Sequence, residues 1–167
     1  GNDPGFSWLS LGGIGEIGKN CYVIEIENKI IVIDVGMSFP DFRMFGVDIE
    51  IPDFSYLVKN QHKIAGIVLT HGHEDHIGSL SYLLQDLRKP PPIYGAKFTL
   101  GLMRPKLADA GLSDTPLNEF TPGYLINVSG INIQTIRVTH SIPDASSLAV
   151  ETPCGIYLHS GDIKIDP

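Results

Sequence analysis

The chain has 167 residues, of which 43% are hydrophobic and 19% are charged, and its formal net charge is −7. This composition fits one soluble globular domain and excludes an intrinsically disordered chain. The negative charge argues against a dedicated basic surface for nucleic acids on this segment, but it does not exclude a nucleic-acid substrate.

The first part of the chain is rich in predicted strands. Apolar and β-branched runs occur at residues 6–11, 21–27 and 29–35, and Asn28 with Lys29 is predicted as the hairpin turn between the last two. Residues 36–54 contain many Gly, Pro and Asp residues and predict a long loop. A short helix is expected at 56–61 and a buried strand at 65–70.

Helical spacing of apolar residues then predicts a helix over 77–87, which the prolines at 90–92 end. A short strand is expected at 93–95 and a helix at 96–111, which Pro105 is expected to kink or interrupt. The chain returns to strands at 124–128, 131–139, 147–152 and 155–160. Strands at both ends with helices between them indicate an α+β fold, with a sheet covered by helices on one face.

Two cysteines do not make a disulfide framework, and we interpret Cys21 and Cys154 as structural or incidental residues. No apolar run approaches the roughly 20 residues of a membrane-spanning helix. We therefore expect a reducing compartment and a cytoplasmic location, or an organellar one if an upstream transit segment has been removed.

A glycine-rich run at residues 12–18, GGIGEIG, contains the pattern G-x-G-x-x-G of dinucleotide-binding proteins, and Asp34 follows at a suitable distance. That function requires a helix directly after the third glycine, because the pyrophosphate binds at the N-terminus of that helix. Here a strand, a turn and a strand follow instead. We therefore predict no nucleotide cofactor, and we interpret the glycines as a tight turn.

Three of the six histidines fall in the sequence HGHEDH, at the junction between a predicted strand and a predicted helix. In an extended segment His71 and His73 point to the same side, whereas Asp75 and His76 begin the next turn and point to a neighbouring place. Imidazole and carboxylate ligands in this arrangement suit Zn²⁺, and their division into two pairs indicates two metal ions. The alternative is a chance cluster of exposed loop histidines.

The H-x-H-x-D-H motif resembles the signature of the metallo-β-lactamase superfamily. Further elements of that signature follow in the expected order: Asp34 ends an early strand, His140 ends a later one, and Asp162 follows a strand in a Gly-Asp pair. The flanking sequences GGIGEIGKN, HGHEDHIG, THSIPD and HSGDIKID narrow the resemblance to the ribonuclease J family, in the β-CASP group, over essentially the whole chain.

The resemblance implies a set of roles. His71, His73 and His140 are similar to the ligands of a first zinc ion, Asp75 and His76 to ligands of a second, and Asp162 to the carboxylate that bridges both. Asp34 is similar to a residue that anchors a ligand histidine without binding metal itself. Catalytic roles are expected for Asp75 and His76, and a role in the substrate pocket for Ser141 and Asp144. A turn fixed by Pro143 explains Ser141 and Asp144 equally well.

The implied activity is that of a zinc-dependent ribonuclease with endonuclease and 5′-to-3′ exonuclease action in RNA maturation and decay. A hydroxide activated by two metal ions would hydrolyse the phosphodiester. The implied partners are RNA and either a second copy or a paralogue, with no membrane.

We expect a metallo-β-lactamase αββα sandwich of which residues 1–167 supply only the N-terminal half. The β-CASP domain, which binds RNA, and a further histidine ligand of the second zinc would be absent. The chain alone would then have little activity and would expose apolar surface where the second sheet should pack. Two alternatives are a superfamily hydrolase of a small ester, thioester or lactam, and a silent domain that binds metal or a partner.

Overall fold

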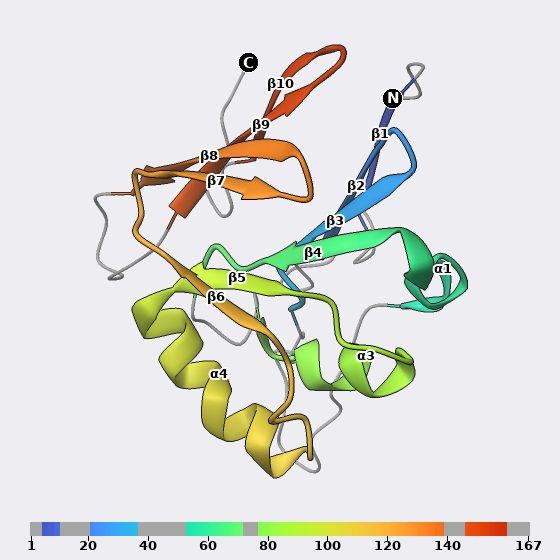
Figure 1. Ribbon diagram of the computed structural model, residues 1–167, viewed down its shortest axis with the longest axis vertical. Helices are drawn as coiled ribbons and strands as arrows, with labels where there is room; N and C mark the ends of the chain where they lie inside the picture. The colour runs from blue at the N-terminus through green and yellow to red at the C-terminus, as the bar shows by residue number, and fades with distance from the viewer. Residues whose placement is uncertain (1–4, 11–20, 37–52, 72–76, 139–145, 160–167) are drawn as a thin grey trace, which may run out of the picture.

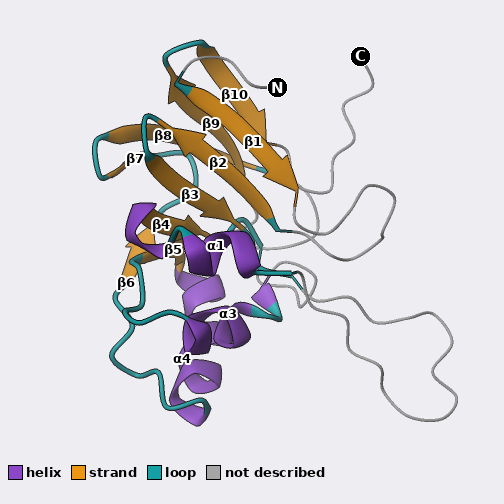
Figure 2. Cartoon of the chain, turned by 90° about the vertical axis from the view of Figure 1, so that its right-hand side faces the viewer, coloured by secondary structure: helices purple, strands orange, loops and turns teal. Residues whose placement is uncertain are grey.

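The computed structural model describes residues 5–10, 21–36, 53–71, 77–138 and 146–159, and for residues 8–10 it describes the backbone alone. These residues form three layers: a layer of helices, a six-stranded sheet and a four-stranded sheet (Figures 1 and 2). The prediction of an α+β fold is confirmed. Among the described helices, none combines the length and the apolar character of a membrane span.

The first sheet has the strand order β1-β2-β3-β4-β5-β6. Its strands β1 to β3 are antiparallel neighbours, whereas β3 to β6 are parallel neighbours. The strands span β1 Phe6–Ser10, β2 Tyr22–Ile26, β3 Lys29–Ile33, β4 Ile64–Val68, β5 Ile93–Ala96 and β6 Leu117–Phe120. Because β3 has helices on one face and the second sheet on the other, it reads as an almost continuous apolar run.

The second sheet is antiparallel throughout and has the order β10-β9-β8-β7. Its strands are β7 Leu125–Val128, β8 Ile131–Arg137, β9 Ser146–Thr152 and β10 Gly155–His159. Alternate residues of these strands pack against the first sheet. Exposed apolar residues lie on its outer face instead, among them Ile136, Ile156 and Leu158. The expectation that apolar surface is exposed for want of a second sheet was therefore wrong, since the chain itself supplies that sheet.

The helical layer consists of α1 Ser55–Lys59, the 3₁₀ turn η1 Gln61–Lys63, α3 Leu80–Asp86 and α4 Lys97–Asp109. Its apolar residues form one core with the facing side of the first sheet, and a second core lies between the two sheets. Pro105 lies within α4 without ending it.

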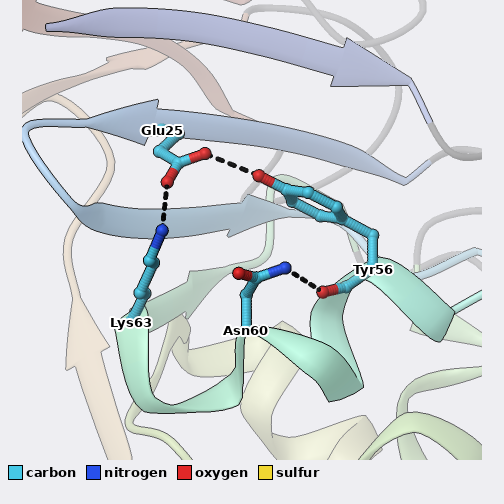
Figure 3. A network of polar contacts seen from close by, with 4 residues as sticks. All are labelled: Glu25, Tyr56, Asn60 and Lys63. Atoms are coloured by element: carbon cyan, nitrogen blue, oxygen red, sulfur yellow. Dashed lines mark hydrogen bonds and ion pairs between the residues drawn. The ribbon is translucent and has the colours of Figure 1, made fainter.

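A polar network fixes α1 and η1 to β2 (Figure 3). The hydroxyl of Tyr56 donates to Glu25 Oε2 over 2.6 Å, and Lys63 Nζ donates to Glu25 Oε1 over 3.1 Å. Asn60 Nδ2 donates to the carbonyl of Tyr56 over 2.8 Å. The hydrogen bond from Tyr56 and the charge of Lys63 hold the pKa of Glu25 below its ordinary value, and the same carboxylate raises the pKa of Tyr56 to about 12.

Two local predictions need correction. The hairpin turn between β2 and β3 consists of Glu27 and Asn28, with φ of 46° and 69°, because Ile26 pairs with Lys29. Two positive φ angles match the primed turns of tight hairpins. The strand β6 was not predicted, since LNEF is short, half polar and at the edge of the sheet.

Candidate metal centre

The candidate site lies at one edge of the first sheet, where the parallel strands β3 and β4 end. Asp34 follows β3 directly, and Thr70 and His71 follow β4. Ile33 pairs with Val68, and the N–H of Asp34 donates to the carbonyl of Val68 over 2.9 Å. The parallel pairing therefore brings residues that are 36 positions apart in sequence to the same edge.

Both carboxylate oxygens of Asp34 contact Thr70. The backbone N–H of Thr70 donates to Oδ1 over 2.7 Å, and its hydroxyl lies 2.6 Å from Oδ2. Both residues are fully buried. Asp34 has a φ of 60°, in the left-handed region, which costs a residue with a Cβ about 1–2 kcal/mol. Two short hydrogen bonds to a buried carboxylate compensate for this strain.

His71 is connected to Asp34 through Thr70. Its Nδ1 lies 2.9 Å from Thr70 Oγ1, and only 6% of the residue is exposed. The second sheet also reaches this point, since the N–H of Ser146 donates to the carbonyl of Thr70 over 2.9 Å. The anchoring role expected for Asp34 would therefore pass through a threonine.

His159, at the end of β10, approaches Asp34 from the second sheet. Its Nε2 lies 3.9 Å from Asp34 Oδ2, too far for a hydrogen bond. Its ring stands edge-on to Tyr22, with 4.7 Å between ring centroids, and Nε2 has no hydrogen-bond partner within the described residues. The sequence patterns predicted no role for His159 or Thr70. Their positions directly before HGHEDH and SGD were the available signal.

Cys21 also belongs to this neighbourhood and is fully buried. The antiparallel pair Tyr22 and Ile33 places Cys21 and Asp34 at the next positions of their two strands. Burial raises the pKa of the Cys21 thiol far above its ordinary value, and the charge of Asp34 raises it further. A thiol held protonated in an apolar core is inert, which fits a structural role.

The other predicted site residues lie outside the described residues: His73, Asp75, His76, His140, Ser141, Asp144 and Asp162. The glycine run at 12–18 also lies outside them, and the next described element is β2, a strand. Within the described ranges no group of three or more His, Cys, Asp or Glu side chains gathers to hold a metal. His71, the predicted ligand that is described, fits such a role because its Nδ1 already faces a hydroxyl.

Comparison with known proteins identifies the family. Residues 14–165 match the Metallo-beta-lactamase superfamily. The chain is 47% identical to Ribonuclease J of Thermus thermophilus over 165 residues and 49% identical to Ribonuclease J of Helicobacter pylori over 158 residues. It is 42% identical to Ribonuclease J2 of Bacillus subtilis over 159 residues. These matches cover 95%, 93% and 95% of this chain and 29%, 23% and 28% of the relatives, respectively, so the chain spans less than a third of their length.

Solved structures show the same fold at low sequence identity. A protein of unknown function from Enterococcus faecalis V583 superposes with a TM-score of 0.69 at 18% identity, over 95% of this chain and 44% of that one. A mutant flavo di-iron protein from Thermotoga maritima superposes with a TM-score of 0.55 at 14% identity, over 80% of this chain and 31% of that one. The superfamily match over 14–165 and this fold lead to one conclusion: the chain belongs to the metallo-β-lactamase superfamily.

Proposed function

We propose that the chain is the N-terminal metal-binding part of a zinc-dependent ribonuclease that hydrolyses RNA phosphodiesters by both endonuclease and 5′-to-3′ exonuclease action. The observation that carries the proposal is the 47% identity to a Ribonuclease J over 95% of this chain. The activity is proposed for the whole protein, because the chain spans only 29% of that relative. RNA is accordingly the proposed substrate, and self-association or assembly with a paralogue is proposed for the same reason.

The proposed ligands of two zinc ions are those implied by the family resemblance: His71, His73 and His140 for the first, Asp75 and His76 for the second, and Asp162 for both. Zinc bound there would lower the pKa of a water molecule to near neutrality and stabilise the negative charge that develops on the phosphate. Asp75 is proposed to orient the attacking water. Ser141 and Asp144 are proposed to shape the substrate pocket.

The described residues hold the side chain of His71 in position. Its ring is buried at the sheet edge and its Nδ1 contacts Thr70, so the side chain has little freedom to rotate. Asp34 keeps Thr70 in place through both of its oxygens. A ligand held in this way loses little entropy when it binds a metal, and rigid ligands favour tight and selective binding.

The test is hydrolysis of a labelled RNA with a 5′ monophosphate by the whole protein, with and without a chelator. We expect cleavage that the chelator abolishes and that zinc restores. His71→Ala should lower the rate by at least about 100-fold, in the range that loss of one essential group produces. The matched control is His62→Ala, an exposed histidine of η1 remote from the sheet edge, which should cleave at the rate of the unchanged protein.

A chromogenic lactam and a glutathione thioester serve as competing substrates in the same assay. Hydrolysis of either one, with intact RNA under all conditions, would overturn the proposal and favour a superfamily hydrolase of small substrates. Cleavage of RNA by the His71→Ala protein at an unchanged rate would show that His71 is not part of the site.

A further inference from the structure

The side chain of Thr70 stands between a buried carboxylate and a buried imidazole. Its Oγ1 lies 2.6 Å from Asp34 Oδ2 and 2.9 Å from His71 Nδ1. Asp34 and Thr70 are fully buried and His71 is 6% exposed, so bulk water does not compete for these contacts. Each of these two contacts therefore needs one donor and one acceptor, and the single proton of the Thr70 hydroxyl can be assigned to one of them.

A threonine hydroxyl carries one proton, and an ionised carboxylate can only accept. The N–H of Thr70 already donates to Asp34 Oδ1, and two donors at one carboxylate stabilise its charged form. The short contact to Oδ2 then uses the proton of the hydroxyl. The remaining contact requires His71 to donate from Nδ1 to Oγ1. The lone pair of a neutral His71 is then on Nε2.

We propose that Thr70 is a positioning residue that holds His71 as its Nδ1–H tautomer, through a hydroxyl oriented by Asp34. The proposal rests on the proposed function, in which His71 binds zinc, and names the residue that prepares this ligand. Metal-binding histidines commonly donate their second ring N–H to an acceptor, which fixes tautomer and orientation. Here the acceptor is the neutral hydroxyl of Thr70, and its hydrogen bond to the carboxylate of Asp34 fixes its orientation toward the ring of His71.

The backbone on both sides of this contact is fixed. The N–H of Asp34 donates to Val68 over 2.9 Å, and the carbonyl of Thr70 accepts from Ser146 over 2.9 Å. Asp34 keeps a φ of 60°, which aims its side chain at Thr70 although the conformation is unfavourable. The end of β3, the end of β4 and the start of β9 therefore fix the position of the Thr70 hydroxyl.

The experiment measures the tautomer of His71 by ¹⁵N NMR in metal-free protein labelled at histidine, at about pH 8, where a histidine of ordinary pKa is neutral. The His71→Gln variant assigns the signal. We expect the Nδ1–H tautomer in the unchanged protein. Thr70→Val keeps the shape of the side chain without the hydroxyl, and should convert His71 to a mixture of tautomers or to Nε2–H. Thr70→Ser restores a hydroxyl and should restore the tautomer.

Zinc affinity, measured by competition with a chelator, gives a second readout that needs no RNA. Thr70→Val should weaken the binding of zinc by about 10–100-fold, the effect typical of losing the partner of a ligand, and Thr70→Ser by much less. The matched control is Thr115→Val, since Thr115 is 7% exposed and precedes β6, at the opposite end of the parallel strands. It should change neither the tautomer nor the affinity.

An Nε2–H tautomer in the unchanged protein would overturn the proposal without any variant, so it stays testable even if Thr70→Val fails to fold. An unaltered tautomer and unaltered zinc affinity in folded Thr70→Val would also overturn it. Failure of the whole protein to cleave RNA would instead contradict the proposed function alone, because neither readout here involves RNA.

Discussion

At Gly66 the packing of the two sheets leaves no room for a Cβ atom. This glycine lies in β4, and a Cβ added there would be 2.8 Å from Val128 Cγ1 of β7 and 3.0 Å from Tyr94 Cε2 of β5. Val128 is fully buried between the sheets. A Cβ contact of this length does not persist in folded proteins, so Gly66→Ala must displace Val128 or the strand that carries it.

Two opposing effects set the change in the free energy of unfolding that Gly66→Ala causes. One extra methyl group in a well-packed core destabilises by about 1–3 kcal/mol. Alanine also restricts the unfolded chain more than glycine does, which returns about 0.4–1 kcal/mol. These two effects span a net loss of roughly 0–2.6 kcal/mol, and we expect Gly66→Ala to lower the free energy of unfolding by about 1.3 kcal/mol, the middle of that range. Gly101→Ala is the matched control, because nothing lies within 4 Å of a Cβ there and the site is in helix α4. It should stabilise by about 0.5–1 kcal/mol.

Urea unfolding with an unchanged m-value measures both substitutions, and a double-mutant cycle with Val128→Ala isolates the clash. In the Val128→Ala background the methyl group that a Cβ would meet is gone, so Gly66→Ala should cost little or stabilise. If Gly66→Ala stabilised the protein as Gly101→Ala does, there would be no clash at Gly66. A cost that is the same with and without the Val128 side chain would show that the clash is not with Val128.

Three further predictions concern charge, backbone strain and thiol exposure. The folded-state pKa of Glu25 is lowered, so its contribution to stability, about 1 kcal/mol or less, is present above the unfolded pKa of about 4.3 and is lost as pH falls through the folded-state pKa. The difference in stability between the unchanged protein and Glu25→Gln, measured by urea unfolding from pH 6 to pH 3, should therefore shrink as pH falls. A difference that stays constant would contradict this prediction. Asp34→Asn should retain about 1 kcal/mol more stability than Asp34→Ala, because asparagine tolerates a φ of 60° better, and equal stabilities would remove the argument from strain. A thiol reagent should label exposed Cys154 in the native protein and buried Cys21 only on unfolding, whereas fast labelling of both would show that the core around Cys21 opens readily.

The sequence predicted most strands because their signals are local. The runs that became β2, β3 and β4 are apolar and β-branched whatever surrounds them, and their neighbours in the chain end them. The division into two sheets could not be predicted from those runs, since it depends on which strands pair. The error at the β2–β3 turn was one residue, because the register Ile26–Lys29 decides which residues turn.

The residues of the candidate site also fall into two groups, those that the sequence predicted and those that it did not. Asp34 and His71 could be predicted because each ends an apolar run and belongs to a motif. Thr70 and His159 could not, because their importance comes from contacts across the fold: Thr70 touches a residue 36 positions away, and His159 reaches Asp34 from the other sheet. Residue type and spacing predict the groups that carry chemistry. The residues that hold those groups are seen only once strands far apart in sequence lie together.

Thr70 also connects the architecture to the proposed chemistry. Its side chain contacts Asp34 and His71, and its carbonyl accepts from Ser146 at the start of β9. The second sheet therefore does more than cover the first, because it fixes the residue on which the orientation of His71 depends. Gly66 lies in β4, the strand that leads into Thr70, and we expect Gly66→Ala to shift the second sheet. If the two sheets support the site jointly, that substitution should weaken zinc binding as well as stability, whereas Gly101→Ala should affect stability alone.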